Sequence, residues 1–293
     1  MMRKFNSCYL LFAVLAAATA VAAAATPKYS NLYVFGDSYS DVGNVSIATG
    51  GARPGPLYYN GRFSNGPLWV DHIAGYLGLQ LSPALAGGTD WAFAGAWVTA
   101  PEDDVPTIPE QVQMYLNATG GKADPNALYF IDGGGNDIVG TTSGDPNALG
   151  YQIATGIADS ELMLRRAGAR HFIIPNLFNV GLLPVAADHV TFAGAASTAA
   201  NYWLGKLLWY EEKLPRIQIL TVDVNSLMNA VQKDNTHFGF EDVTNPCMVI
   251  GDSSVTVCDD PDHTYFWDVY HPTTFGHSFF AVVIETVLAQ QGQ

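Results

Sequence analysis

Short apolar runs alternate along this chain with longer segments whose apolar residues recur every three or four positions. The short runs have the length of buried strands, and the longer segments have the period of amphipathic helices. Strands are predicted at residues 32–35, 127–131, 171–174 and 217–222. Helices are predicted from Gly66 onward and over residues 109–117, 148–167, 191–213 and 272–289. Strands separated by helices predict an α/β domain whose parallel sheet is covered on both faces.

Two stretches show neither period. Residues 50–65 are rich in Gly, Pro and Tyr, and residues 234–263 mix short apolar runs with Asp, Asn and Gly. Both are expected to be irregular, and they would either wall a cleft or form passive surface.

The first 25 residues have the pattern of a signal peptide. Arg3 and Lys4 precede an apolar core at residues 9–18, and the alanines at 23–25 provide a cleavage site. The alternative is a membrane anchor, but the core is short for a span and no other run reaches the roughly 18 apolar residues required. Residues 1–25 are therefore predicted to be removed, and residues 26–293 are predicted to form a single secreted, extracellular domain.

The charge balance narrows the set of partners. The chain has 27 acidic and 13 basic residues and a formal net charge of −14, which becomes −16 without Arg3 and Lys4. Such a surface repels polyanions, and no basic stripe interrupts it. A nucleic-acid partner and stable membrane insertion are therefore not expected.

Secretion changes how the cysteines and asparagines are interpreted. Cleavage would leave Cys247 and Cys258, and an oxidising compartment favours a disulfide between them, with two free thiols as the alternative. Asn44 and Asn117 each begin an N-glycosylation pattern. Asn117 is the better candidate, because Asn44 lies close in sequence to Ser38.

Ser38 and a distant Asp268–His271 pair suggest the chemistry. The apolar run at 32–35 leads into a small-residue turn that would lift the Ser38 hydroxyl to the sheet edge. Asp268 precedes His271 by three residues, so the two side chains would share one side of a helical turn. A serine hydroxyl needs a neighbouring base to become a nucleophile, and a carboxylate can orient that base.

Four islands of sequence, in order, resemble the four blocks of the SGNH hydrolases, also called the GDSL-type lipase/esterase family. The islands are residues 36–44, 90–96, 133–137 and 266–272. Residues 60–67 also resemble a segment of the secreted plant-like and bacterial branch, so the resemblance covers essentially the whole predicted mature chain. Tyr39 departs from the leucine of the family name, at a position that varies in the family.

The resemblance implies a three-layer, flavodoxin-like α/β/α sandwich and ester hydrolysis without a metal or organic cofactor. It makes Ser38 the nucleophile, His271 its base and Asp268 the residue that orients the base. The oxyanion would be held by the backbone N–H groups of Ser38 and Gly95 and by the side-chain amide of Asn136.

The expected function is that of a secreted serine esterase that cleaves carboxylic esters through an acyl-enzyme. The acidic surface and the lack of an evident hydrophobic lid slightly favour short-acyl or carbohydrate-linked esters over lipid esters. The alternatives are a lipase or phospholipase acting on longer-chain lipids, and a catalytically silent secreted binding protein. An α/β-hydrolase elbow fits poorly, because the glycine expected two residues after Ser38 is replaced by Ser40.

Several of these residues also have a structural interpretation. Gly95 could serve only tight packing, the Asn136-Asp137 pair could cap a helix, and Asp268 could cap the helix after it. Ser253 follows a second Gly-Asp pair, but the frame between the two cysteines is too short for a strand, a nucleophile turn and a helix. Four aromatic residues are expected to line an acyl or leaving-group pocket or to pack in the core: Tyr58, Tyr59, Phe63 and Trp267.

Overall fold

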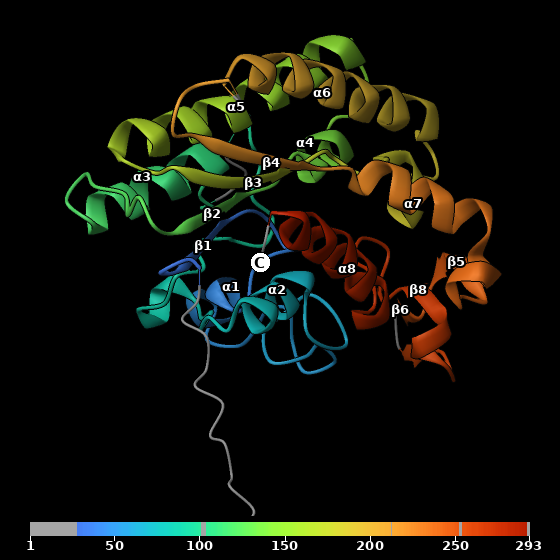
Figure 1. The fold of residues 1–293 in the computed structure, drawn as a ribbon. Helices are drawn as coiled ribbons and strands as arrows, with labels where there is room; N and C mark the ends of the chain where they lie inside the picture. Colours follow the sequence, from blue (N-terminus) through green and yellow to red (C-terminus); the bar gives the residue numbers. More distant parts are fainter. Residues whose placement is uncertain (1–27, 101–103, 212, 252–253, 292–293) are drawn as a thin grey trace, which may run out of the picture.

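Four parallel strands form the central sheet of the protein. The computed structural model describes residues 28–100, 104–211, 213–251 and 254–291 (Figure 1). The sheet order is β1-β2-β3-β4, and the strands are β1 (Leu32–Phe35), β2 (Leu128–Ile131), β3 (His171–Pro175) and β4 (Gln218–Val222). Every residue of β2 is buried, as expected for a strand in a sheet covered on both faces.

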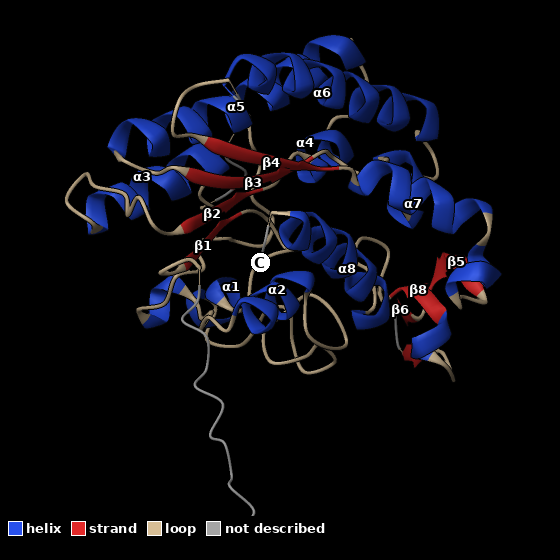
Figure 2. Ribbon diagram, in the orientation of Figure 1, coloured by secondary structure: helices blue, strands red, loops and turns tan. Residues whose placement is uncertain are grey.

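Helices cover both faces of this sheet (Figure 2). α5 packs against α3 and α6 on one face, and α2 packs against α8 on the other. This arrangement confirms the predicted α/β class with its parallel central sheet. None of the described helices combines the length and apolar character needed to cross a membrane. The helices are α1 (Asn44–Ala48), α2 (Trp69–Leu77), α3 (Ile108–Ala118), α4 (Gly135–Gly140), α5 (Pro146–Ala167), α6 (Val190–Glu211), α7 (Val224–Lys233) and α8 (Thr274–Gln290).

A short segment extends the sheet beyond β1. The N–H of Val34 donates to the carbonyl of Thr89 at 3.2 Å, and the N–H of Trp91 donates to the carbonyl of Val34 at 2.7 Å. The bridge between Val34 and Asp90 is parallel. β1, β2 and the segment around Asp90 are therefore all parallel, and the chain leaves each of them at the carboxyl-terminal edge of the sheet.

The stretch predicted to be irregular at residues 234–263 contains three short strands, and a fourth follows it. β5 (Asp242–Pro246) pairs with β8 (Thr264–Phe266), and β6 (Met248–Ile250) forms a hairpin with β7 (Val255–Val257). The prediction was wrong here because the three strands within the stretch are short and largely exposed, so that no burial pattern marks them.

α7 was also missing from the prediction. It begins after Asp223, whose side chain accepts the N–H of Ser226 at 3.0 Å. Only Val224, Met228 and Val231 are buried in it. These three residues recur at the spacing of one helix face, so the sequence carries the helical period here and the prediction overlooked it.

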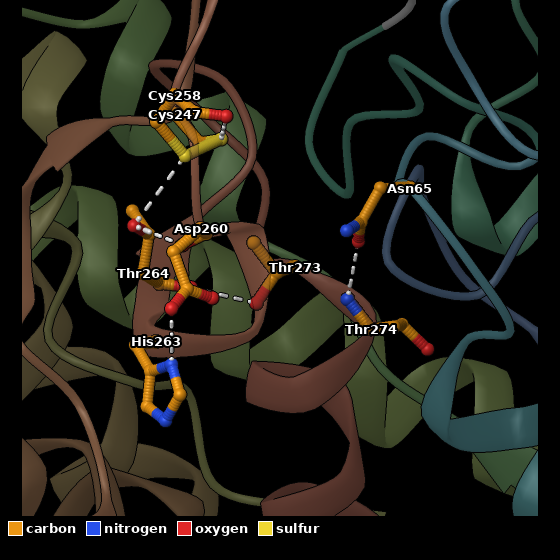
Figure 3. Close-up of a disulfide and its surroundings, with 8 residues drawn as sticks. All are labelled: Asn65, Cys247, Cys258, Asp260, His263, Thr264, Thr273 and Thr274. Atoms are coloured by element: carbon orange, nitrogen blue, oxygen red, sulfur yellow. Dashed lines mark hydrogen bonds and ion pairs between the residues drawn. A yellow bond between two sulfur atoms is a disulfide. The ribbon is translucent and has the colours of Figure 1, made fainter.

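The predicted disulfide is confirmed. Cys247 and Cys258 are bonded, with their Cα atoms 4.8 Å apart, and they flank the β6–β7 hairpin (Figure 3). The N–H of Cys247 donates to the carbonyl of Phe266 at 2.9 Å, and that of Met248 donates to Trp267 at 2.7 Å. The hairpin is thus attached to the chain immediately before Asp268.

Candidate active site

Ser38 lies in a tight turn directly after β1. The N–H groups of Ser40 and Asp41 both donate to the carbonyl of Asp37 at 3.0 Å. The carboxylate of Asp37 accepts the N–H of Tyr39, also at 3.0 Å. These bonds close the turn on both sides of Ser38.

Gly36 allows the turn to sit against the next strand. A Cβ atom at this position would lie 2.0 Å from a carboxylate oxygen of Asp132, which follows β2. The Gln111 side chain on α3 donates to the carbonyl of Gly36 and accepts its N–H, both at 2.9 Å. The start of the turn is therefore fixed from two neighbouring elements.

Ser38, His271 and Asp268 form a hydrogen-bonded chain. The distance from His271 Nε2 to Ser38 Oγ is 2.8 Å, and that from His271 Nδ1 to Asp268 Oδ2 is 2.7 Å. Each of the three residues is only 7% exposed. The structure thus brings Ser38 together with an Asp–His pair that lies more than two hundred positions later in the chain.

The Asp268–His271 pair lies in a bend and not in the predicted helical turn. Asp268 Oδ1 accepts the N–H groups of Tyr270 at 2.7 Å and of His271 at 2.8 Å, which closes the bend. The cap of α8 is Thr273, whose hydroxyl accepts the N–H of Gly276 at 3.2 Å. Asp268 is therefore not a helix cap.

Gly95 lies in a loop, and Asn136 lies in the first turn of α4. The amide of Asn136 donates to the carbonyl of Ala96 at 2.9 Å, so the loop of Gly95 is joined to the start of α4. Gly95 has φ of +88°, and an added Cβ would meet no atom within 4 Å. Backbone conformation, and not crowding, therefore requires glycine here, which argues against the tight-packing interpretation.

Two buried carboxylates brace these loops. Asp41 accepts the N–H of Ala94 at 2.9 Å, which ties the serine turn to the loop of Gly95. Asp137 accepts the N–H groups of Val98 at 2.8 Å and of Thr99 at 2.9 Å. Asp137 thus holds the loop after Gly95 and does not cap α4, whose N-cap is a glycine.

A small cleft opens at Ser38. Ser38, Asn136 and His271 line it together with apolar side chains, among them Phe178 and Leu183. Gly95 is not among its lining residues. The four aromatics expected from the sequence do not line this cleft either: Tyr58, Tyr59, Phe63 and Trp267. Phe63 instead packs beside the His271 ring, with ring centroids 5.3 Å apart.

Burial shifts the pKa values of the carboxyl groups near Ser38. It raises the pKa of Asp37 to about 6 and, together with the nearby Asp37, raises the pKa of Asp132 well above its ordinary value. Burial would also raise the pKa of Asp268, but His271 and the hydrogen bonds to its carboxylate hold that pKa below the ordinary value. Asp268 is thus kept ionised next to His271.

The other histidines do not form a second site. Burial, followed by the proximity of His271 and His72, lowers the pKa of His277 to about 3, so that this ring stays neutral. His263 pairs with Asp260 on the surface. Among the residues that the structure describes, no three or more His, Cys, Asp or Glu side chains are grouped to hold a metal ion. Ser253 lies outside the described residues.

The structure contradicts one glycosylation candidate. The Asn44 side chain is 0% exposed, and its amide donates to the carbonyls of Asp90 and Ala92, each at 2.9 Å. A glycan therefore cannot be attached to Asn44 in the folded protein. Asn117 is exposed near the end of α3, and its glycosylation stays a prediction.

Two tyrosines belong to the site in a way that the sequence did not indicate. The hydroxyl of Tyr39 donates to the carbonyl of Tyr270 at 2.7 Å, which ties the serine turn to the histidine loop. The hydroxyl of Tyr58 donates to Asp268 Oδ2, also at 2.7 Å. Neither contact could be predicted from the spacing of residues in the sequence, because each joins segments more than two hundred residues apart.

Comparison with known proteins places this site in a family. The family model described as GDSL-like Lipase/Acylhydrolase matches residues 32–284. "GDSL esterase/lipase At3g09930" of Arabidopsis thaliana is 24% identical over 85% of this chain and 88% of its own length. "Lipase 1" of Photorhabdus luminescens is 33% identical over 58% of this chain, which spans only 25% of that protein.

One further relative and one similar solved structure have names that state different activities. "Phosphatidylcholine-sterol acyltransferase" of Aeromonas hydrophila is 26% identical over 84% of this chain and 72% of its own. The solved structure of Est24, a carbohydrate acetylesterase from Sinorhizobium meliloti, has a TM-score of 0.49 and 13% identity, over 89% of this chain and 99% of that one. The extent of the family match and the order of its blocks lead to one conclusion: the chain belongs to the GDSL-like lipase/acylhydrolase family of ester-bond hydrolases.

Proposed function

We propose that this protein is a secreted serine esterase that cleaves carboxylic esters through an acyl-enzyme on Ser38. The observation that carries the proposal is the hydrogen-bonded chain in which His271 contacts Ser38 Oγ at 2.8 Å and Asp268 at 2.7 Å. A silent binding protein would have no need for this alignment of a hydroxyl, an imidazole and a buried carboxylate.

In the first half-reaction, Ser38 Oγ forms a bond to the ester carbonyl carbon while His271 Nε2 takes the hydroxyl proton. The carbonyl π electrons move to the oxygen, and the N–H groups of Ser38 and Gly95 and the amide of Asn136 would stabilise that oxyanion. Asp268 holds the other ring nitrogen of His271 and stabilises the imidazolium.

The tetrahedral intermediate then collapses. The bond from carbon to the leaving oxygen breaks, and His271 gives its proton to the departing alcohol. In the second half-reaction, a water molecule attacks the acyl carbon while His271 takes a proton from this water. The bond from the acyl carbon to Ser38 Oγ then breaks, and His271 returns the proton to Ser38 Oγ. The ester is thereby split into an acid and an alcohol, and the side chains return to their starting state.

The size of the cleft and the net negative charge of the chain both limit which esters are suitable substrates. The cleft at Ser38 is small, which favours a short acyl group over an extended chain, and a net charge of −14 disfavours anionic lipid surfaces. We therefore favour short-acyl or carbohydrate-linked esters. The alternative is a lipase or phospholipase activity. The names of the Photorhabdus relative, a lipase, and of the Aeromonas relative, a phosphatidylcholine-sterol acyltransferase, support lipid esters as substrates.

We also propose that the protein is exported as one domain, residues 26–293, after removal of residues 1–25. The leader lies outside the described residues. The Cys247–Cys258 bond supports an oxidising compartment, since such bonds are rare in the cytosol. N-terminal sequencing of secreted protein, expected to begin near Thr26, tests this part.

The substrate is tested with an acyl-chain series. We expect kcat/KM for p-nitrophenyl esters to be highest for the shortest chains and to fall steadily toward sixteen carbons, because longer chains outgrow the cleft. Acetylated xylan and a phospholipid serve as natural counterparts. A maximum at long chains together with phospholipid hydrolysis would favour the lipase alternative, and inactivity of the intact protein on every ester would refute the esterase proposal.

A further inference from the structure

Tyr58 makes a direct contact with the proposed triad. Its hydroxyl donates to Asp268 Oδ2 at 2.7 Å, and the same oxygen accepts His271 Nδ1 at 2.7 Å. The other oxygen, Oδ1, accepts the N–H groups of Tyr270 and His271 and lies 2.9 Å from His271 Nδ1. His271 Nδ1 therefore faces both carboxylate oxygens, whereas the Tyr58 hydroxyl contacts only Oδ2.

The segment that carries Tyr58 is attached to the histidine loop. Ser64 Oγ donates to the carbonyl of Pro272 at 2.9 Å, and Asn65 Oδ1 accepts the N–H of Thr274 at 2.7 Å (Figure 3). The Tyr58 ring also packs edge-on against Trp267, with centroids 6.4 Å apart. The tyrosine hydroxyl thus reaches Asp268 from a segment that is fixed on both sides of His271.

Tyr58 is suited to act as a donor at every working pH. Burial, followed by the charge of Asp268 and the hydrogen bond to it, raises the pKa of Tyr58 above the ordinary tyrosine value. The phenol therefore keeps its proton, and its hydrogen bond to an ionised partner belongs to the stronger class.

We propose that Tyr58 is a positioning residue that sets how strongly Asp268 stabilises the protonated form of His271. Its hydrogen bond withdraws negative charge from Oδ2, which is the carboxylate oxygen nearer to His271 Nδ1. Without this bond, the carboxylate would attract the imidazolium proton more strongly, and His271 would stay protonated, and thus inactive as a base, up to a higher pH. The inference rests on the proposed roles of Ser38, His271 and Asp268.

Other polar and titratable groups also lie near His271. Tyr39 and Tyr270 lie beside the ring with centroids 5.9 and 5.8 Å away. Asp37 interacts electrostatically with His271, and the neutral His277 packs edge-on against Tyr39. None of these four donates to Asp268 through its side chain in the part of the chain that the structure describes. Substitution of Tyr58 should therefore change one identifiable contact.

The test is the pH dependence of kcat/KM for a short-chain p-nitrophenyl ester in Tyr58→Phe. We expect the acid limb of the profile to move to higher pH by about half a unit or more, and the plateau to fall by about tenfold, the scale of one hydrogen bond to a charged group. Tyr59→Phe is the matched control, since Tyr59 is 40% exposed and packs under Arg62. Its profile is expected to overlay that of the unmodified protein.

A second variant keeps the inference testable if Tyr58→Phe folds poorly. A 3-fluorotyrosine at position 58 keeps the shape of the ring but donates more strongly, so the acid limb is expected to move to lower pH. An acid limb that stays in place in either folded variant, whatever the loss of rate, would overturn the inference and leave Tyr58 a packing residue.

Failure of this inference can be told apart from failure of the proposed function. If Ser38→Ala is inactive while the acid limb of the Tyr58 variants does not move, only the role of Tyr58 is wrong. If Ser38→Ala retains full activity, the triad assignment itself is wrong.

Discussion

At the scale of single residues, two Asp-x-x-His pairs share one short stretch of chain. Asp268–His271 and Asp260–His263 have the same spacing and the same 2.7 Å separation of carboxylate oxygen and Nδ1. The first pair has side chains about 10% exposed, whereas those of the second are about half exposed. Burial and contact with Ser38, not spacing, therefore distinguish the proposed triad pair from a surface ion pair.

This duplication provides a matched test of Asp268. In Asp268→Asn, the amide would favour the wrong tautomer of His271, and kcat is expected to fall by about 10⁴-fold with little change in KM. Asp260→Asn removes a carboxylate with the same local geometry and is expected to stay within about twofold of the unmodified protein. Steady-state kinetics on one ester measure both variants. Equal losses in the two variants, or full activity in Asp268→Asn, would argue against the triad.

At the scale of elements, the proposed triad depends on loops that are held by neighbouring strands and hairpins. The β6–β7 hairpin is closed by the disulfide and pairs with the chain that leads into Asp268. Cys258 Sγ lies 3.6 Å from the hydroxyl of Thr264, and the hydroxyl of Thr273 donates to the carbonyl of Thr264 at 2.8 Å (Figure 3). The bridge therefore supports the histidine loop from the side opposite Asn65.

Removal of the bridge should lower stability. For Cys247→Ala combined with Cys258→Ala, we expect the free energy of unfolding to fall by about 2–4 kcal/mol, because the unfolded chain is no longer cross-linked. Urea denaturation monitored by circular dichroism measures this loss as a lower midpoint. Reductant should then affect the unmodified protein but not the double variant. A midpoint that is unchanged by the double substitution would show that the bridge contributes nothing.

The pairing of α5 with α6 contains a buried charge. Glu161 accepts Arg165 Nε at 3.0 Å, and the same guanidinium pairs with Glu211 at 2.6 Å. Burial raises the pKa of Glu161 to about 7, against the opposing influence of Arg165. The folded state therefore holds a proton that the unfolded chain loses above the ordinary value of 4.5, so stability falls as pH rises from about 4.5 through 7.

Glu161→Gln should remove this dependence. The glutamine stays neutral, so the melting temperature of the variant, relative to that of the unmodified protein, is expected to be higher at pH 8 than at pH 5. Thermal melts of both proteins at the two pH values measure this difference in melting temperature. A difference that is the same at both pH values would contradict a raised pKa at Glu161.

At the scale of the whole molecule, periodicity was enough to predict the parallel sheet and its covering helices. Apolar runs such as residues 128–131 are buried on both faces, and this burial is what their composition reflects. The hairpin at 248–257 escaped prediction because Val249 and Ile250 are exposed. These strands are held by the disulfide and by backbone hydrogen bonds to the chain before Asp268. Neither kind of bond requires a periodic pattern of apolar residues in the sequence.

The candidate site was predictable where residue type carries the chemistry. Ser38, Asp268 and His271 could be singled out because nucleophile, orienting group and base need particular side chains. The role of Tyr58 could not be predicted, since one tyrosine among several in a long loop carries no sign of which group its hydroxyl meets. Burial of Asn44 was equally hidden, because its amide is enclosed by residues 85–92, a segment distant in the sequence.

The central claim is that Ser38 forms the acyl-enzyme, and covalent labelling tests it most directly. Intact-mass analysis after treatment with a serine-directed phosphonate is expected to show one adduct, located by peptide mapping on Ser38. Ser38→Ala should take up no adduct and lose at least about 10³-fold in kcat/KM, whereas Ser46→Ala, a matched serine on α1, should behave like the unmodified protein. An adduct on another residue, or full esterase activity in Ser38→Ala, would contradict the account.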